Sequence, residues 1–188
     1  MSQAHLITRI VQMVLGAGLL LGLSAYLAVL WGAPWAPTPR RTREAMLRLA
    51  DIQPGERVVD LGAGDGRLVM AAARLYRAQA VGVEIDPLRC LVANGLIYLG
   101  GLQHRARVVW GNLFDFDLQG ADVVLLYLLQ HTNSQLWPKL AQELSPGARV
   151  VSRSFTLPHW TPAAIDEELG LFLYRVVPKG AVVETRFV

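Results

Sequence analysis

The apolar and polar positions after residue 50 follow two alternating patterns. Short and nearly continuous apolar runs predict buried strands, which cover residues 57–61, 80–85, 106–110, 122–126 and 148–155. Between them, amphipathic stretches predict helices over residues 67–76, 86–99 and 134–144. Strands that alternate with helices favour an α/β fold, with a Rossmann-like, doubly wound and mostly parallel sheet.

Both ends of this alternating region carry local signals of their own. Apolar runs at residues 171–177 and 181–187 flank the turn-forming sequence Pro178-Lys179-Gly180, so we expect a C-terminal antiparallel hairpin at the sheet edge. Ahead of the first strand, Thr38 and Pro39 are typical of a helix start, with Thr38 as the N-cap and a helix that runs to about Ala50.

The N-terminal segment has a different pattern from the rest of the chain. Residues 10–31 form a run of 22 residues without a charge, which as a helix would cover about 33 Å and could cross a bilayer core. A cleaved signal peptide is the alternative, although its apolar core is usually shorter. We therefore expect one N-terminal transmembrane helix within residues 1–35, and a second domain over residues 36–188.

The distribution of charge adds an orientation to this picture. Arg40, Arg41 and Arg43 follow the apolar run, whereas Arg9 precedes it, so the positive-inside rule predicts a single-pass protein with a cytoplasmic C-terminal domain. The prediction places it in a bacterial inner membrane, with the lipid bilayer as a partner. The net charge is only +3, and no long Lys/Arg run indicates nucleic acid binding.

Metal and disulfide chemistry are not indicated either. The chain has one cysteine, Cys90, which allows no internal disulfide and suits a reducing compartment. The four histidines show no spacing typical of metal ligands. We therefore predict no metal site.

The candidate chemistry begins with the glycine-rich turn after the first strand. Its sequence places Asp60 two residues before Gly62, with Gly64, Asp65 and Gly66 following. A dinucleotide fingerprint would require a third glycine at position 67, which is an arginine. An acid together with free loop amides suits the zwitterionic tail of S-adenosylmethionine better than a pyrophosphate, so we assign Asp60, Gly62, Gly64 and Asp65 to this cofactor. A glycine-rich turn without a ligand is the alternative.

Two further candidates lie at the ends of the next two strands. Glu84 follows Asp60 by 24 residues, and its carboxylate can accept hydrogen bonds from two ribose hydroxyls. The alternative, a cap for the following helix, is already provided by Asp86. After the third strand, Asn112 and Leu113 are candidates to contact the adenine, with an ordinary turn asparagine as the alternative. All these residues lie at strand carboxyl ends, where ligands bind in open α/β sheets.

These motifs resemble the class I, seven-stranded methyltransferases over about residues 55–155. DLGAGDG is similar to their first motif, VGVEID to the ribose-binding acid, and WGNLFDFDL to the adenine region. The chain also resembles the small membrane-anchored family that includes the mitochondrial ATP synthase c-subunit lysine methyltransferase, through PWAPTPRRTREAMLRLA, LLYLL and VVSRSFTLPHW. This resemblance implies a lysine substrate in a membrane or membrane-proximal protein.

The resemblance also implies roles on the substrate side of the site. Tyr127 is expected at the end of the fourth strand beside the transferred methyl group, as the catalytic residue that contacts the acceptor amine, although packing on the sheet is an equal alternative. Thr38 is expected in a segment that covers the cofactor and lines the substrate channel. Because Leu126-Tyr127-Leu128-Leu129 replaces the N/D-P-P-Y/F motif of amide-nitrogen methyltransferases, methylation of DNA adenine or glutamine is not expected.

Two other functions remain open at this stage. A methyltransferase for a lipid or quinone-like small molecule would use a membrane anchor equally well. A non-catalytic membrane protein with a vestigial cofactor fold is the third possibility, and the intact Asp60, glycines and Glu84 argue against it.

Overall fold

The computed structural model describes residues 3–30, 38–177 and 184–188. The chain divides after residue 35 into two compact units, which we describe separately. The first contains the helix α1 (Gln3–Leu30), which has no acidic residue in its first turn and no basic residue in its last.

The transmembrane prediction concerns this first unit. Among the residues that the structure describes, no helix combines the length and the mean hydropathy that a membrane crossing requires. The expected transmembrane helix therefore has no support from the structure and stays a prediction. The last residue of the uncharged run, Trp31, lies outside the described residues.

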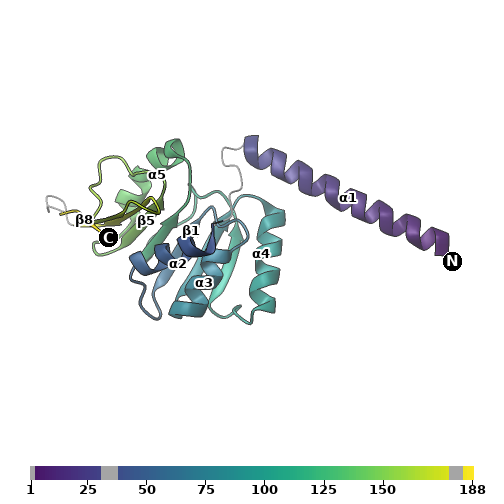
Figure 1. The fold of residues 1–188 in the computed structure, drawn as a ribbon, viewed down its shortest axis with the longest axis horizontal. Coiled ribbons are helices and arrows are strands. Elements are labelled where there is room, and N and C mark those ends of the chain that lie inside the picture. The colour runs from purple at the N-terminus through teal and green to yellow at the C-terminus, as the bar shows by residue number, and fades with distance from the viewer. Residues whose placement is uncertain (1–2, 31–37, 178–183) are drawn as a thin grey trace. The chain divides into compact units, whose positions relative to one another are not determined.

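The second unit is an α/β domain built on one eight-stranded mixed sheet (Figure 1). The strand order is β3-β2-β1-β4-β5-β7-β6-β8, and the pairs among β1 to β5 are all parallel. These five strands are β1 (Arg57–Leu61), β2 (Gln79–Glu84), β3 (Ala106–Trp110), β4 (Val123–Leu126) and β5 (Arg149–Arg153). The predicted α/β, Rossmann-like sheet is thus confirmed, and its strands lie within two residues of the predicted bounds.

Helices cover both faces of this sheet. One buried cluster joins α2 (Arg40–Leu49), α3 (Arg67–Tyr76) and α4 (Pro87–Leu99) to side chains such as Val58, Leu125 and Val151. The other joins α5 (Gln130–Glu143) to the alternating positions, such as Val59, Leu126 and Val150. Because successive side chains of a strand point to opposite faces, these two clusters identify the face to which each strand residue belongs.

The helix boundaries correct two predictions. Thr38 is not an N-cap, since α2 begins one residue later than expected and Pro39 occupies that position without a side-chain cap. The helix expected from residue 134 begins instead at Gln130. Its first turn is held by Asn133, whose amide donates to Ser152 Oγ at 3.0 Å and to the Phe155 carbonyl at 3.2 Å. These contacts come from β5 and its following loop, which no local pattern reveals.

The C-terminal hairpin is also different from the prediction. β7 (Leu171–Arg175) pairs antiparallel with β5 and with β6 (Ala164–Asp166), a three-residue strand that the sequence pattern did not reveal. The last strand, β8 (Arg186–Phe187), pairs with β6 in parallel. Since β7 already has β5 on one side and β6 on the other, it has no free edge for residues 186–187. The expected turn at 178–180 lies outside the described residues.

Candidate active site

Two acidic side chains meet at the carboxyl ends of β1 and β2. Asp60 pairs in register with Gly82, and Glu84 lies two residues further along the same strand, so both project from the sheet face that α2, α3 and α4 cover. Asp60 is 3% exposed and Glu84 is 5% exposed. The predicted pair of acids therefore occupies one edge and one face of the sheet.

Glu84 is fixed by backbone amides on both sides. Its Oε2 accepts from the Gly64 N–H at 2.7 Å, and its Oε1 accepts from the Asp86 N–H at 3.0 Å. The capping role belongs to Asp86, whose Oδ1 accepts from Leu88 N at 2.9 Å at the start of α4. Each Glu84 oxygen keeps a second lone pair, so the carboxylate can still accept hydrogen bonds from hydroxyl groups.

Asp60 has a different environment. Within the described part of the chain, no group donates a hydrogen bond to its carboxylate. Burial raises its pKa to about 7, and the negative charges of Glu84 and Asp65 add to this shift. A buried carboxylate without a counterion is costly to ionise, and a bound cation would relieve that cost.

The glycine-rich turn brings the backbone close to these acids. Gly62, Gly64 and Gly66 all have positive φ angles, of 84°, 56° and 73°. A Cβ at Gly62 would lie 3.0 Å from Leu128 Cδ2, and a Cβ at Gly66 would lie 3.2 Å from Ala93 Cβ. Both the conformation and the packing therefore require glycine.

The expectation that this turn presents free amides is wrong for its first half. The N–H groups of Gly62 and Ala63 donate to the Val83 carbonyl at 2.9 and 3.0 Å, and that of Gly64 donates to Glu84. These bonds tie the turn to β2 because it must cross the end of that strand. The turn contributes shape at these positions, while the ligand-facing charge comes from Asp60 and Glu84.

Asp65 and Thr38 are linked through a residue that the sequence did not single out. Arg67 Nε donates to Asp65 Oδ1 at 2.9 Å, and Arg67 Nη1 donates to the Thr38 carbonyl at 3.2 Å. Thr38 is buried. The main chain of Thr38 therefore lies beside the glycine-rich turn. The Asp65 carboxylate forms an ion pair with Arg67.

The third strand end positions Asn112 and Leu113 less tightly. Asn112 is exposed, and its Oδ1 accepts from Phe114 N at 3.1 Å, as in a turn capped by its own side chain. Leu113 is half-buried against the cluster on the α5 face. The Asn112 carbonyl oxygen is thus engaged locally, which leaves its amide N–H groups as the donors for a ligand.

Tyr127 is paired with an arginine that no sequence motif indicated. The Arg153 guanidinium lies 4.4 Å from the centre of the Tyr127 ring. Leu126 pairs with Ser152 in register, so Tyr127 and Arg153 continue the β4–β5 ladder by one position, on the same sheet face as Asp60. Arg153 Nε and Nη1 are buried without a hydrogen-bond partner. A cation–π contact therefore fixes both side chains at the carboxyl edge of the sheet.

The described residues include no group of three or more His, Cys, Asp or Glu side chains that could hold a metal ion. The site therefore consists of two buried acids, a glycine turn and an aromatic–arginine pair, all at the carboxyl ends of parallel strands. This is the arrangement expected of a nucleoside-containing ligand site in an α/β fold.

A family model described as the ANTKMT methyltransferase domain matches residues 60–164, which is more than half of the chain. The chain belongs to this methyltransferase family. The predicted class of enzyme, an S-adenosylmethionine-dependent methyltransferase, is thereby confirmed.

Individual relatives agree with this assignment. The chain is 41% identical over 133 residues to a protein-lysine N-methyltransferase of Saccharolobus islandicus (strain REY15A), covering 70% of this chain and 83% of that relative. It is 34% identical over 135 residues to the adenine nucleotide translocase lysine N-methyltransferase of Mus musculus, covering 72% of this chain and 58% of that protein. The predicted resemblance to lysine methyltransferases is therefore confirmed.

Solved structures agree on the fold and the cofactor class. A crystal structure described as an RNA methyltransferase from Salinibacter ruber in complex with S-adenosyl-L-homocysteine has a TM-score of 0.72 and 39% sequence identity. The match covers 79% of this chain and 98% of that one.

Proposed function

We propose that this methyltransferase transfers a methyl group from S-adenosylmethionine to the ε-amino group of a lysine in a membrane or membrane-proximal protein. The observation that carries the cofactor part is the buried Asp60 carboxylate, which the described residues leave without a cation, next to the amide-bound Glu84. Lysine is supported by the relatives, which are named as lysine methyltransferases.

The residues present fit this cofactor. Asp60 would hold the α-ammonium group, which offsets the cost of burying its charge. Glu84 would accept the two ribose hydroxyls, and the Asn112 amide together with Leu113 would contact the adenine. Gly62 and Gly66 let the turn pack closely against Leu128 and Ala93.

The chemistry that follows is an in-line displacement. When bound, S-adenosylmethionine supplies a methyl carbon activated by its sulfonium. The chain must align the acceptor nitrogen and exclude water. A lysine amine attacks only when neutral, so it must first lose a proton to solvent. Tyr127 would accept a hydrogen bond from this amine, and the guanidinium of Arg153 would disfavour the ammonium form.

RNA is a second candidate acceptor, because the solved structure with 39% identity is described as an RNA methyltransferase. The test supplies labelled S-adenosylmethionine to the full-length enzyme and to membranes, RNA and lipid extract from cells that lack the gene. We expect label in protein, recovered as methyllysine after hydrolysis. Label in RNA or in the organic extract alone would overturn the lysine proposal.

Two variants connect this activity to the proposed site. Glu84→Ala and Asp60→Ala should each weaken S-adenosyl-L-homocysteine binding by about 100-fold, because each removes a charged contact worth roughly 3 kcal/mol. Glu168→Gln, which changes an exposed carboxylate paired with Arg41, is the matched control and should bind as the wild type does. Wild-type affinity in both site variants would refute the site assignment.

The location of the enzyme is part of the proposal. The uncharged run at residues 10–31 and the arginines that follow it support a single-pass protein with its catalytic domain in the cytoplasm. Protease treatment of right-side-out and inverted inner-membrane vesicles tests this. Digestion of the catalytic domain in inverted vesicles only is the expected result, and recovery of the enzyme in the soluble fraction would contradict it.

A further inference from the structure

A cavity, which we call the amino-edge cavity, lies at the amino ends of β1, β2 and β3. Its volume is about 390 Å³. Small-molecule sites usually measure about 300–1,000 Å³. Asp60 and Glu84 lie at the opposite ends of β1 and β2, so this cavity is separate from the proposed cofactor site. Its lining includes side chains from the first residues of the three strands and from the adjacent turns: Arg57, Gln79, Val81, Arg105, Arg107 and Asp122.

The cavity lies on the face of the sheet that carries α5. Arg57 pairs in register with Gln79, and Val81 pairs with Arg107, so these side chains project from that face. Of the described helices, only α5 contributes to the core cluster there, and the connection from β3 to β4 over residues 111–122 contains no helix. Val81 is buried but belongs to neither core cluster. This part of the sheet is therefore left for the cavity.

The arginines of the amino-edge cavity keep their charge uncompensated. Among the described residues, no carboxylate forms an ion pair with Arg57, Arg105 or Arg107. Arg57 Nη2 donates to the Asp117 carbonyl at 3.2 Å, and Arg105 Nη1 donates to the Arg77 carbonyl at 2.9 Å, but both acceptors are neutral. The exposed Arg107 side chain has no hydrogen-bond partner in the described part of the chain.

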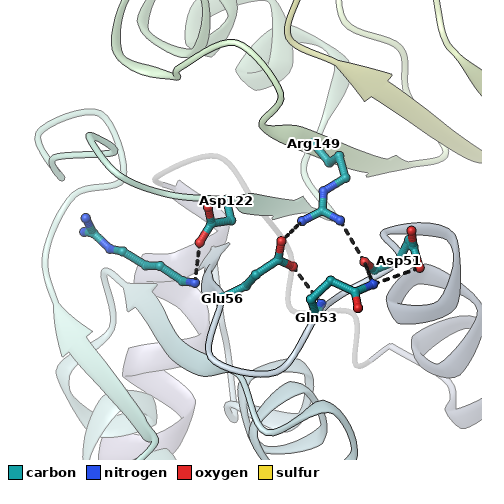
Figure 2. A network of polar contacts seen from close by, with 6 residues as sticks. Asp51, Gln53, Glu56, Asp122 and Arg149 are labelled. Carbon is teal, nitrogen blue, oxygen red and sulfur yellow. Dashed lines mark hydrogen bonds and ion pairs between the residues drawn. The ribbon is translucent and has the colours of Figure 1, made fainter.

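One acid, Asp122, lies among the described lining residues, and its Oδ2 accepts from the Arg57 N–H at 2.8 Å (Figure 2). Three arginines against one carboxylate leave a surplus of two positive charges. Protection of a sheet edge would explain an arginine on β3. It does not explain Arg57, because β1 is a central strand. The surplus therefore indicates a ligand of opposite charge.

We propose that the amino-edge cavity binds a small molecule that carries a phosphate monoester. Such a group has a charge of about −1.5 to −2 at pH 7, which matches the surplus. The guanidinium fork binds phosphate in a bidentate manner, and Arg107 would be the principal contact because no described residue engages its donors. Gln79 and Val81 would contact the rest of the ligand. This site goes beyond the proposed function, since it holds neither the cofactor nor the methyl acceptor.

The experiment titrates the full-length protein in mild detergent with ribose 5-phosphate, and isothermal calorimetry measures the Kd. S-adenosyl-L-homocysteine is present at saturation, so that the probe cannot occupy the cofactor cleft. Ribose is the control without a phosphate, and citrate is the control that carries carboxylates instead. Arg107→Gln and Asp122→Asn change the cavity. Arg175→Gln, which removes an exposed arginine of β7 outside the lining, is the matched control.

We expect ribose 5-phosphate to bind the wild type with a Kd below about 1 mM, and ribose not to bind. Arg107→Gln should weaken binding at least about tenfold, because it removes a charge-assisted contact. Asp122→Asn should tighten binding about threefold, because it removes a like charge. Arg175→Gln should change the Kd by less than about twofold, since solvent and salt screen a distant charge. An unfolded variant cannot produce the tighter binding, so the two opposite shifts test the site together.

Four results would overturn the inference. Absence of binding to the wild type, or equal weakening by Arg107→Gln and Arg175→Gln, would mean that the cavity is not a phosphate site. Citrate that binds as tightly as ribose 5-phosphate would remove the preference for phosphate. Short single-stranded RNA that binds more tightly than ribose 5-phosphate, and only while Arg107 is present, would make the cavity part of a nucleic-acid surface instead. Failure to bind S-adenosyl-L-homocysteine would count against the proposed function alone.

Discussion

The two edges of the sheet bury charged side chains in different ways. At the amino edge, Arg149 reaches from β5 to the loop between α2 and β1, where its Nη1 donates to the Asp51 carbonyl at 2.7 Å and its Nη2 contacts Glu56 (Figure 2). Glu56 Oε2 in turn accepts from Gln53 N at 2.8 Å. Arg149 and Glu56 therefore neutralise one another inside the chain.

At the carboxyl edge the balance is different. Asp60 is as deeply buried as Arg149, but the charged groups among the described residues that shift its pKa are Glu84 and Asp65, which carry the same sign. The amino edge therefore stabilises the fold, whereas the carboxyl edge has the properties of a binding site. A charge that the fold has already neutralised stabilises the fold, whereas one that the fold leaves uncompensated indicates a ligand of opposite charge.

The largest loss of stability is expected at the amino edge. Arg149→Met should lower the free energy of unfolding by about 3 kcal/mol, because it leaves the half-buried Glu56 without its partner. Affinity for S-adenosyl-L-homocysteine should stay within about twofold of the wild type, since the network lies at the opposite edge from Asp60. Urea unfolding in mild detergent and calorimetry measure the two quantities.

The double variant Arg149→Met/Glu56→Gln is the control for this prediction. Removing both charges should restore a large part of the lost stability, because the effects of mutations in a coupled pair are not additive. Equal stabilities of the single variant and the wild type would show that the network is not structural, and the contrast between the edges would then fail.

At the carboxyl edge, Asp60→Asn should change the pH dependence of stability. The pKa of Asp60 is about 7 in the folded protein and 3.8 in the unfolded reference, so the folded state holds an extra proton between these values. The stability that this provides is present below pH 4 and is lost as the pH rises to 7. Relative to the wild type, the ligand-free Asn variant should therefore gain roughly 4 kcal/mol between pH 4 and pH 8.

The measurement is urea unfolding of both proteins at several pH values without cofactor. Parallel pH profiles for wild type and Asp60→Asn would mean that Asp60 is not the uncompensated group. At pH 8 the same substitution should weaken cofactor binding, so greater stability and lower affinity would occur together. That opposition is the signature of a binding site, whereas Arg149→Met should lose stability and keep its affinity for the cofactor.

The fold was largely predictable because its strands and first helices depend on local signals. Short apolar runs located β1 to β5, and the Asp86-Pro87 pair located the start of α4 correctly. β6 was missed because three residues, one buried and two half-buried, are too few to show a periodic pattern. The hairpin was assigned to the wrong partner strands because strand order is set by which sheet edge is free, and a turn sequence does not report that.

In the candidate site, too, the residues in local motifs were predicted and those that depend on contacts between distant segments were not. Asp60, the glycines and Glu84 were found because the first βα units have a fixed order and spacing. Arg67 and Arg153 were missed, because their partners Thr38 and Tyr127 lie 29 and 26 residues away in the sequence. The signal that would have found Arg153 is the β4–β5 register, which places it beside Tyr127 and can be counted only once those strands are paired.

A smaller effect is expected in the glycine-rich turn. Gly66→Ala introduces a side chain at φ 73° and 3.2 Å from both Ala93 Cβ and Val108 Cγ2, so it should lower the free energy of unfolding by about 2 kcal/mol. Gly55→Ala, at φ 87° but with open space around it, is the matched control and should cost about 1 kcal/mol. Thermal unfolding of the two variants separates the cost of steric crowding plus backbone strain, in Gly66→Ala, from the cost of backbone strain alone, in Gly55→Ala. Equal losses would show that the turn is not tightly packed at the carboxyl edge.

The smallest expected effect separates the charge of Arg153 from its planar contact with Tyr127. Arg153→Lys keeps the charge but loses the stacked guanidinium, so we expect about a threefold decrease in kcat with little change in the KM for S-adenosylmethionine. Arg153→Met removes the charge as well. If that charge disfavours the ammonium form of the acceptor, the pH profile of kcat should shift to higher pH in the Met variant and stay in place in the Lys variant. Membranes from cells that lack the gene supply the acceptor. A purely structural role would lower thermal stability in both variants and move neither profile, which would place Arg153 with Arg149 among the charges that serve only the fold.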